Sequence, residues 1–553
     1  MAVVVLLKTA LLSVTTNVHD HYLVGLLNYP NSFVPEALAN HTSGTELATG
    51  PTCEESDFAS AWCAMELGPF DYVPSVGFSD IEPVLDANGD RIDGQFWCTT
   101  DNGYGSSANS WDYPLHIHKM RIQKPFTFRH GGSTFDTYTQ TESLGVSLIH
   151  DPNRLVSWEN GADIQVAYAT PDSTWDDWKA LRVLTGRDFD LEGMAIHSAN
   201  YAIMGEELMP ALFAIDPATG VVLSNFVRTP DIDANGSFNG KFLSSKGDKV
   251  HCTIEALEAN ECHISTDDVV DASDYVRHGS SGGYEGLVPM ADGSTTAFIE
   301  RNAGSTLADR GEPGTRVYRV TGSAESPTPV FESFLGFYKF EVEVGIDAIA
   351  DASALPNAPN KIAVVERNGW PSGKLVPGQG VPNNRVCIID ITVKDADNVF
   401  IKNCVLNYHR IMDPFDTDND GLTVAAFSQW TTEQLIVVDD HCLIAGTDTN
   451  FPSTNQFGLT SDNTPYLQET YDTRWMVVCY YDPIFSAAGV DHPGQCNAQP
   501  PRMEKYTPEA CKEDSECPSG FSCKCVVSSA RHRERNLLFA SMAYGDVECY
   551  CLP

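Results

Sequence analysis

One motif recurs along the middle of this chain and constrains its fold more than any other feature. Each copy reads acid, apolar run, turn, apolar run, acid, and its first and last acids lie 14 or 15 positions apart. Two apolar runs joined by a turn containing Gly, Asn or Asp predict a β-hairpin. The four clearest copies occupy residues 192–206, 285–300, 351–366 and 433–448.

Two looser copies precede these, at Glu82…Asp101 and at Glu142…Glu159. No long segment has the periodicity of a helix, so the pattern predicts an all-β fold. Six hairpins arranged around an axis predict a six-bladed β-propeller. The two ends of a hairpin meet at one edge of the sheet, where paired residues lie about 5 Å apart. We therefore expect the two acids of each copy to be neighbours at one mouth of the central channel.

Repeated pairs of neighbouring acids favour a bound cation, because like charges directly opposite one another destabilise a sheet. Calcium fits such a site, since it takes about 6–8 oxygen ligands from carboxylates, amides and carbonyls. The alternative is that the acids cap the blade edges and accept hydrogen bonds from backbone N–H groups. The expected metal ligands are Asp101, Glu192, Glu206, Glu285, Glu300, Glu366, Glu433 and Asp448.

Three arginines lie close to these acids in the sequence. Arg301 and Arg367 directly follow closing acids. Successive side chains of a strand point to opposite faces, so we expect both to face away from the channel. Arg187 precedes the third hairpin and has no such obstacle, so it is the candidate for binding the substrate.

A separate acidic loop, Asp416, Asp418 and Asp420 followed by Gly421, matches the first half of an EF-hand calcium loop. Its twelfth position is Phe427, where an EF-hand has a bidentate Glu. These three acids are therefore candidate ligands of a surface calcium ion, and an acidic turn is the alternative.

The charge of the chain excludes two classes of partner. It has 35 Lys and Arg against 75 Asp and Glu, a net charge of −40. Such a surface repels nucleic acid and anionic membranes and attracts divalent cations. After the N-terminus, no run approaches the roughly 20 apolar residues that span a bilayer. We expect no nucleic-acid partner and no membrane span.

Cysteine spacing and the N-terminus indicate an exported protein. Residues 1–20 resemble a signal peptide with an imperfect apolar stretch. Two sequons, at Asn40 and Asn235, are compatible with glycosylation. Seven of the 16 cysteines crowd the C-terminus and predict a small disulfide-rich module. These seven are Cys496, Cys511, Cys517, Cys523, Cys525, Cys549 and Cys551.

The chain is accordingly divided into five parts. Residues 1–20 are the expected signal peptide, and residues 21–75 an irregular N-terminal segment. Residues 76–485 form the expected propeller, residues 486–510 a Pro-rich linker, and residues 511–553 the Cys-rich tail, which could bind a protein partner.

Several segments resemble the phytase-like family, also called the esterase-like activity of phytase domain. They are DFDLEGMAI at 188–196, GGYEGLVPMADGSTTAFIERN at 282–302, DASALPNAPNKIAVVERNG at 351–369 and TEQLIVVDDHCLIAGTDTNF at 432–451. The resemblance covers about residues 76–455 and implies a secreted propeller with phosphoesterase or esterase activity. Two positions depart from the Glu-Gly pattern: Gln434 follows Glu433, and Asp351 opens the copy at 351–366.

These observations lead to one expected function and two alternatives. The first is a secreted calcium-dependent phosphoester or ester hydrolase acting on a small molecule, with Glu192 and Glu285 as the catalytic candidates. In such an enzyme, the calcium ion would polarise a phosphoryl oxygen and activate a bound water. The second is a non-catalytic extracellular protein that calcium stabilises and whose tail binds a partner. The third is a lactonase-like six-bladed hydrolase with one calcium ion.

Overall fold

The structure is a computed structural model. It describes residues 21–29, 77–103, 110, 113–123, 126–130, 133–137, 140–156, 160, 163, 180–232, 236–244, 275–277, 282–301, 312–340, 348–367, 384–408, 411–412, 424–425, 432–448, 457–459, 465–467, 473–480, 522–527 and 547–552. Five expectations lie outside the described residues: the signal peptide 1–20, the linker 486–510, the two sequon asparagines, and the acidic loop of Asp416, Asp418 and Asp420.

Four blades are four-stranded sheets built from strands that follow one another along the chain. The first contains β2 (Asp80–Leu85), β3 (Arg91–Thr99), β4 (His116–Gln123) and β7 (Gln140–Leu148). The second contains β8 (Leu191–Ser198), β9 (Tyr201–Glu206), β10 (Ala211–Ile215) and β11 (Val227–Arg228). The third contains β15 (Tyr284–Pro289), β16 (Thr295–Ile299), β17 (Thr315–Thr321) and β18 (Val330–Tyr338), and the fourth β19 (Ala348–Ala354), β20 (Lys361–Arg367), β21 (Arg385–Lys394) and β22 (Phe400–Asn407).

The fifth blade joins the two ends of the propeller. It contains β25 (Thr432–Val437), β26 (Cys442–Thr447), β29 (Thr473–Tyr480), β1 (His21–Tyr29), β23 (Ile411–Met412) and β24 (Val424–Ala425), in the order β25-β26-β29-β1-β23-β24. β1 pairs antiparallel with β29 and parallel with β23. Residues 21–29, which we had placed in an irregular segment, therefore close the ring.

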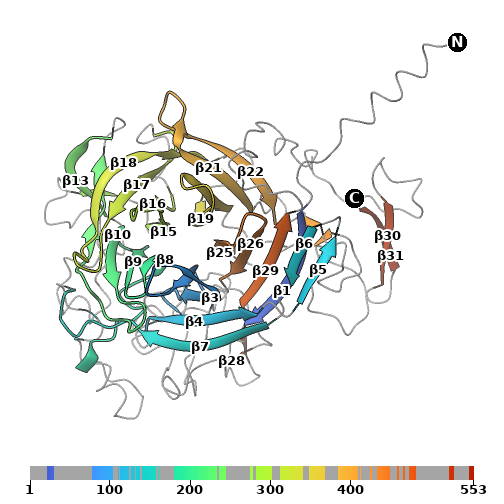
Figure 1. The fold of residues 1–553 in the computed structure, drawn as a ribbon, viewed down its shortest axis with the longest axis horizontal. Coiled ribbons are helices and arrows are strands. Elements are labelled where there is room, and N and C mark those ends of the chain that lie inside the picture. The colour runs from blue at the N-terminus through green and yellow to red at the C-terminus, as the bar shows by residue number, and fades with distance from the viewer. Residues whose placement is uncertain are drawn as a thin grey trace.

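The described strands form five blades, so the prediction of an all-β propeller is confirmed and the prediction of six blades is wrong. The innermost strands are β2, β8, β15, β19 and β25; each lies beside the next, and β25 lies beside β2 (Figure 1). The miscount came from the copy that begins at Glu142. That acid lies on β7, which pairs with β4 as the outermost strand of the first blade.

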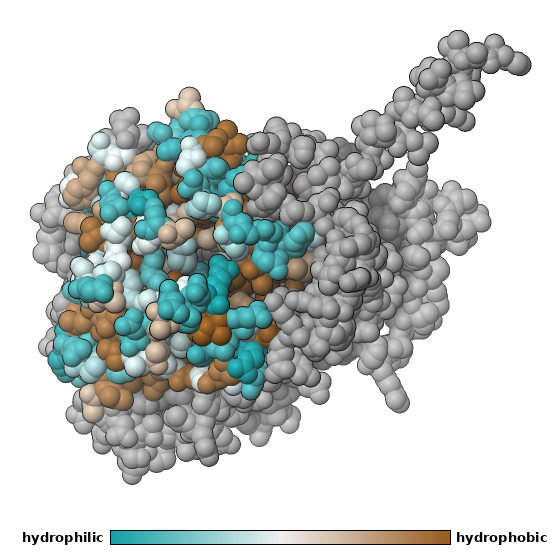
Figure 2. All heavy atoms as spheres, in the orientation of Figure 1, coloured by the Kyte–Doolittle hydropathy of each residue, from teal (hydrophilic) through white to brown (hydrophobic). Residues whose placement is uncertain are grey.

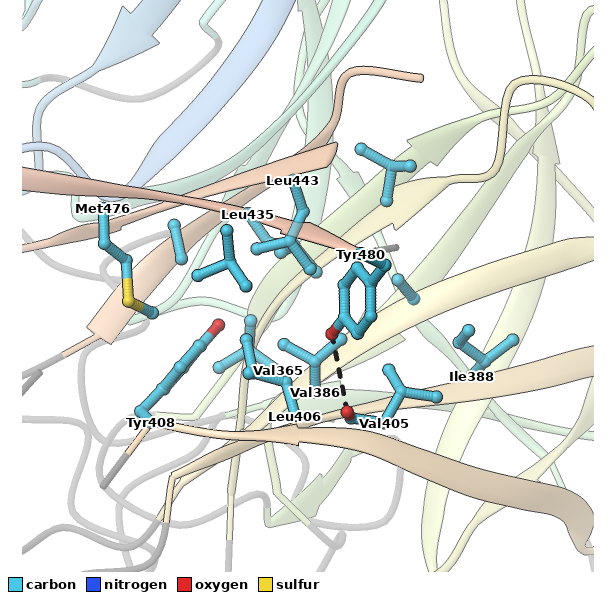
Figure 3. Close-up of a cluster of buried hydrophobic side chains, with 14 of the residues drawn as sticks. Val365, Val386, Ile388, Val405, Leu406, Tyr408, Leu435, Leu443, Met476 and Tyr480 are labelled. Atoms are coloured by element: carbon cyan, nitrogen blue, oxygen red, sulfur yellow. Dashed lines mark hydrogen bonds between the residues drawn. The ribbon is translucent and has the colours of Figure 1, made fainter. Parts of the chain in front are cut away.

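The hydrophobic core consists of five clusters, each lying between two neighbouring blades. Figure 3 shows the cluster between the fourth and fifth blades, where Leu435 and Leu443 pack against Val365 and Val386. The Tyr480 hydroxyl, in the same cluster, donates to the backbone oxygen of Val405 at 3.4 Å. Because every blade buries both faces of its sheet, its strands read as nearly continuous apolar runs.

Two disulfides join neighbouring strands within blades. Cys387–Cys404 links β21 to β22, and Cys442–Cys479 links β26 to β29. In the Cys-rich tail, β30 (Ser522–Val527) and β31 (Val547–Leu552) form a hairpin. Its register places Cys523 opposite Cys551 and Cys525 opposite Cys549.

Three smaller sheets complete the described fold. They are β12 (Pro230–Ile232), β13 (Phe238–Ser244) and β14 (Tyr275–Arg277); β5 (Phe126–His130) and β6 (Ser133–Thr137); and β27 (Phe457–Leu459) and β28 (Pro465–Leu467). The part of the chain that the structure describes has no helix long and apolar enough to span a bilayer. On the face shown in Figure 2, hydrophilic residues run across the middle, over the inner strands.

Candidate metal centre

The opening acids of the motif lie at β-bulges on the innermost strands. On β25, Thr432 pairs with Thr447 and Gln434 pairs with Gly446, which leaves Glu433 as the extra residue. On β8 and β15, the Glu-Gly dipeptides at Glu192 and Glu285 each face a single residue of the partner strand. A bulge bends the strand and re-aims a side chain. The bulges therefore turn three carboxylates out of the regular pleat, two of them in Glu-Gly dipeptides and the third in Glu433-Gln434.

In the second, third and fifth blades, the residue 15 positions after the bulge acid takes the closing position. Glu300 and Asp448 follow their bulge acids by 15 residues, and each comes directly after the last residue of its strand. In the second blade the residue 15 positions after Glu192 is Glu207, not Glu206. The sequence prediction aligned Glu206 as the closing acid, at a spacing of 14, one residue short of the other three clear copies.

Glu206 instead serves the backbone. Its carboxylate accepts a hydrogen bond from the Asp190 N–H at 3.0 Å and another from the Met209 N–H. This is the edge-capping role that we had weighed as the alternative for the acids, and it applies to Glu206. Glu207 takes its place among the acids that lie together near the axis, which are described below.

The fourth blade has a cation at the closing position, where the second, third and fifth blades have an acid. Its bulge residue is Ala350, because Ile349 pairs with Glu366 and Asp351 with Val365. Arg367 pairs with Ala348 and is buried. Its Nη2 lies 3.4 Å from Glu285 Oε1, 3.2 Å from Glu300 Oε1 and 3.1 Å from Glu433 Oε1.

The prediction that Arg367 faces away from the channel acids is therefore wrong. The bulge at Ala350 was not visible in the sequence, and Arg367 occupies the closing position instead of Glu366. Arg301 also contacts a channel acid, since its Nη2 lies 2.9 Å from Glu300 Oε1 while its side chain is 44% exposed.

Glu366 does not join the acids of the channel. It pairs with Arg385 Nε at 2.6 Å and with the Lys402 ammonium. Glu366, Cys387 and Cys404 have donor atoms close enough to hold an ion. The two sulfurs form a disulfide, however, and metal binding by cysteine requires a thiolate. Glu366 thus stabilises the fourth blade internally.

Polar side chains on the inner strands tie one blade to the next. Asp351 accepts a hydrogen bond from the Leu435 N–H at 2.5 Å, and Gln434 donates to the backbone oxygen of Phe78. Asp80 accepts one from the Met194 N–H. The two departures from the Glu-Gly pattern, Asp351 and Gln434, are therefore links between blades.

Glycine is required after the bulge where two blades approach without such a link. A Cβ at Gly193 would lie 2.4 Å from the backbone oxygen of Glu285. A Cβ at Gly286 would lie 2.9 Å from the Cβ of Ala352. The Gly of Glu-Gly thus permits close packing, while its Glu supplies the carboxylate.

The structure brings five acids together in two groups that share one member. Each group has carboxylate oxygens within 4.8 Å of one another: Asp190, Glu192 and Glu207 in one, and Glu207, Glu285 and Glu300 in the other. We call the five residues the acidic cluster. Of the expected ligands it contains Glu192, Glu285 and Glu300.

Three further expected ligands lie around the acidic cluster. Glu433 joins it through Arg367. Asp101 is buried and accepts a hydrogen bond from the Gly103 N–H at 2.8 Å, and the charges of Asp190 and Glu433 act on it. Asp448 is buried, and both it and Asp101 act on Tyr113.

Burial raises the pKa values of Glu192, Glu285, Asp190 and Glu207, and repulsion from neighbouring acids adds to the shift at Glu192, Glu285 and Glu207. Burial raises the pKa of Glu192 well above its usual value, and the charges of Glu285 and Asp190 raise it further. Burial, followed by the charge of Glu300, likewise raises the pKa of Glu285. The pKa values of Asp190 and Glu207 are also raised, in each case mainly by burial.

Three carboxylate oxygens of the cluster have no hydrogen-bond partner in the described structure: Glu192 Oε2, Glu285 Oε2 and Glu300 Oε2. Their residues are 7%, 1% and 0% exposed. Buried polar atoms are almost always hydrogen-bonded, so three such oxygens in one cluster require an explanation. A hard cation that prefers carboxylate oxygens fits them, and calcium is such an ion.

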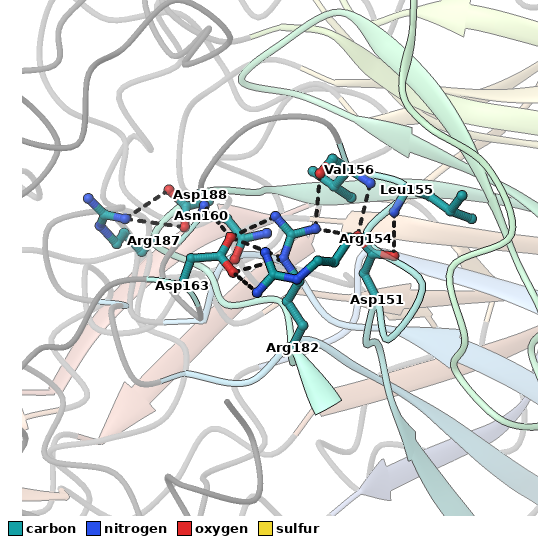
Figure 4. A network of polar contacts seen from close by, with 9 residues as sticks. All are labelled: Asp151, Arg154, Leu155, Val156, Asn160, Asp163, Arg182, Arg187 and Asp188. Carbon is teal, nitrogen blue, oxygen red and sulfur yellow. Dashed lines mark hydrogen bonds and ion pairs between the residues drawn. The ribbon is translucent and has the colours of Figure 1, made fainter. Parts of the chain in front are cut away.

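Arg187, the residue expected to bind the substrate, forms an ion pair with Asp188. It is buried, and its Nη1 lies 3.3 Å from Asp188 Oδ1 (Figure 4). In the same view, Arg182 binds Asp151 and Asp163, at 2.5 Å and 2.7 Å. These ion pairs fix the segment that leads into β8.

Sequence reasoning missed Asp190, Glu207 and Arg367. Asp190 lies two positions before Glu192, and both of its oxygens accept hydrogen bonds from Asn102, at 2.9 Å and 2.7 Å. A uniform spacing of 15 would have found Glu207. No sequence signal distinguishes Arg367 from Arg301 without knowledge of the bulge at Ala350.

The chain belongs to the Phytase-like family, described as "Esterase-like activity of phytase", whose model matches residues 76–451. The resemblance noted in the sequence is thus confirmed. No curated protein matches the chain.

Solved structures similar to the chain are distant from it. Pseudomonas fluorescens PhoX, in complex with the transition state analogue vanadate, is 8% identical with a TM-score of 0.34, over 86% of this chain and 97% of that one. The major Malassezia sympodialis allergen Mala s 1 is 9% identical with a TM-score of 0.27, over 73% of this chain and 77% of that one.

Proposed function

We propose that this protein is a calcium-dependent phosphoester hydrolase whose active site is the acidic cluster. The family description supports hydrolysis of an ester, and phytase-like members imply a phosphoester. The observation that carries the proposal is the set of unpartnered buried oxygens on Glu192, Glu285 and Glu300. Repulsion among these acids would be costly unless a cation offset it.

The proposed ligands are the acids whose oxygens lie together. Asp190, Glu192, Glu207, Glu285 and Glu300 would hold the ion, with Asp101, Glu433 and Asp448 next to them. A bound calcium ion would polarise a phosphoryl oxygen and lower the pKa of a water molecule. It would also offset the net charge of −40, which otherwise repels an anionic substrate.

Two roles fall to the chain's own residues. Glu192 and Glu285 are the proposed catalytic residues, because whichever of their open Oε2 atoms the ion does not take up can accept a proton from an attacking water. Arg301 is the proposed contact for the phosphoryl group, since it is half-exposed beside Glu300. Arg187 is a weaker proposal for that role, because it is buried and paired with Asp188.

Export of the protein is part of the proposal. Two disulfides, Cys387–Cys404 and Cys442–Cys479, support an oxidising compartment. The acidic loop of Asp416, Asp418 and Asp420 remains proposed as a separate surface calcium site. The Cys-rich tail remains a proposed site for a protein partner.

The test is hydrolysis by the purified full chain after removal of metal by a chelator. Nitrophenyl phosphate, phytate, a nitrophenyl carboxylic ester and a lactone are offered with and without added calcium. We expect calcium-dependent release of phosphate, and a loss of about 100-fold or more in Glu192→Gln and Glu285→Gln. Glu332→Gln, an exposed acid that pairs with Arg319, is the matched control.

Other outcomes favour the alternatives. Calcium that raises the melting temperature without turnover of any substrate supports a non-catalytic, calcium-stabilised protein. Hydrolysis of the lactone alone supports a lactonase, although the described five-bladed ring differs from the six-bladed fold of that alternative.

A further inference from the structure

The two halves of the acidic cluster differ in their surroundings. In the first half, each oxygen of Asp190 accepts one hydrogen bond from Asn102, and Oε2 of Glu192 has no hydrogen-bond partner. Within the described part of the chain, no Lys or Arg forms an ion pair with Asp190 or Glu192. Asn102 Oδ1 is also buried without a partner, and amide oxygens are ligands that calcium accepts.

The second half already contains two positively charged side chains, those of Arg367 and Arg301. Arg367 Nη2 lies 3.4 Å from Glu285 Oε1 and 3.2 Å from Glu300 Oε1. Arg301 lies 2.9 Å from the same oxygen of Glu300. The other oxygens of Glu285 and Glu300, both Oε2, have no partner. This half thus retains open ligand atoms next to fixed positive charge.

Glu207 is the shared member of the two halves. Its carboxylate comes within 4.8 Å of oxygens in both groups, and its Oε1 accepts a hydrogen bond from the Gly282 N–H at 3.0 Å. That bond joins the second blade to the start of the third. One carboxylate therefore reaches two sets of ligands on neighbouring blades.

We propose that the acidic cluster holds two divalent cations of unequal affinity, with Glu207 shared between them and Arg367 weakening the second. This inference rests on the proposed metal centre and deepens it. The tight subsite contains Asp190 and Glu192, and the weak subsite contains Glu285 and Glu300. Because like charges repel strongly in a buried site, the guanidinium of Arg367 opposes an ion bound to Glu285 and Glu300.

Such an arrangement would suit the proposed reaction. Two neighbouring cations can bind the attacking and the leaving oxygens of a phosphoryl displacement. The weak subsite would then fill only at higher calcium concentration, so activity would depend on calcium in two steps.

The test is titration of the chelator-treated full chain with calcium by isothermal titration calorimetry, without substrate. We expect two ions in the cluster with dissociation constants at least tenfold apart. Asp190→Asn should remove the tight ion and leave the weak one. Glu300→Gln should remove the weak ion alone, and Glu207→Gln should weaken both at least tenfold.

Arg367→Met supplies the decisive variant, because it removes the charge while keeping an apolar side chain. We expect it to tighten the weak subsite at least tenfold and to leave the tight one within threefold. If Arg367→Met does not fold, Glu300→Gln and Asp190→Asn still separate the two subsites. Glu332→Gln should bind calcium as the parent chain does.

Two results would overturn the inference. One is a single ion at the cluster, lost equally in Asp190→Asn and Glu300→Gln. The other is a weak subsite that Arg367→Met weakens further. The variant Asp418→Asn identifies any ion bound at the acidic loop, and that ion is subtracted from the total to give the number of ions in the acidic cluster. Two ions without hydrolysis would leave this inference standing and refute the proposed function, whereas one ion with hydrolysis would do the reverse.

Discussion

Arg367 Nη2 lies 3.1 Å from Glu433 Oε1, which joins the end of β20 in the fourth blade to the bulge of β25 in the fifth. The same nitrogen reaches Glu285 and Glu300 of the third blade. One guanidinium therefore connects three consecutive blades near the axis. Arg367 belongs to the fourth blade, whose bulge residue is Ala350 and not an acid.

Arg367→Met should destabilise the metal-free protein. Removing one partner of a buried ion pair costs about 3–5 kcal/mol, because the remaining charge is left uncompensated. Here three carboxylates lose their shared cation. Urea unfolding in the presence of a chelator measures the change in the free energy of unfolding.

Arg319→Met is the matched control, since Arg319 pairs with Asp292 and Glu332 at the exposed edge of the third blade. Exposed pairs contribute about 0–1 kcal/mol. Equal losses in the two variants would show that Arg367 does not neutralise the acidic cluster.

The stability of the metal-free protein should fall as the pH rises. Burial raises the pKa values of Glu192 and Glu285, so the folded state binds protons that the unfolded state has lost. Stability therefore begins to fall near the unfolded pKa of about 4.3 and continues to fall up to the raised pKa of the folded state. Thermal unfolding in chelator at a series of pH values measures this.

Calcium should reverse the trend. A bound cation favours the ionised carboxylates, so calcium affinity and the stability of the loaded protein both rise over the same pH range. The double variant Glu192→Gln, Glu285→Gln should show a smaller fall in chelator. A metal-free protein that gains stability on going from pH 5 to pH 8 would contradict the raised pKa values.

The sequence predicted the hairpins because period-2 apolar runs and turn residues are local signals. It predicted that opening and closing acids would meet, and Glu285 and Glu300 do. It could not predict which face each acid takes, because one bulge shifts the register and exchanges Glu366 for Arg367. The number of blades depended on contacts far apart in sequence, namely β7 with β4 and β1 with β29.

The two disulfides should contribute unequally to stability. Cys387–Cys404 closes a separation of 17 residues and Cys442–Cys479 one of 37. Constraint of the unfolded chain predicts about 3 kcal/mol for the shorter loop and about 4 kcal/mol for the longer. Replacing each pair by alanines and measuring urea unfolding tests this.

The ion pairs next to Cys387–Cys404 could reverse the order of stability that loop length predicts. Glu366 lies beside Cys387, and Arg385 and Lys402 hold it in place. If the Cys387 and Cys404 double variant is the less stable one, these ion pairs depend on the disulfide, and loop length does not decide the order.

Closure of the ring should depend on β1. Leu23 and Leu27 are buried, and β1 lies between β29 and β23 in the fifth blade. Leu27 packs in the cluster between the fifth and first blades with Ile81 and Trp475. Leu27→Ala should therefore cost about 2–5 kcal/mol, as for a buried leucine.

Leu181→Ala is the control, because Leu181 is 44% exposed and should lose little. Removal of residues 21–29 should expose the edge of β29, because β1 pairs with that strand. An exposed edge strand pairs with other chains, so the shortened protein should aggregate, as size-exclusion chromatography would show. A monomeric, folded protein without residues 21–29 would mean that β29 can end the fifth blade alone.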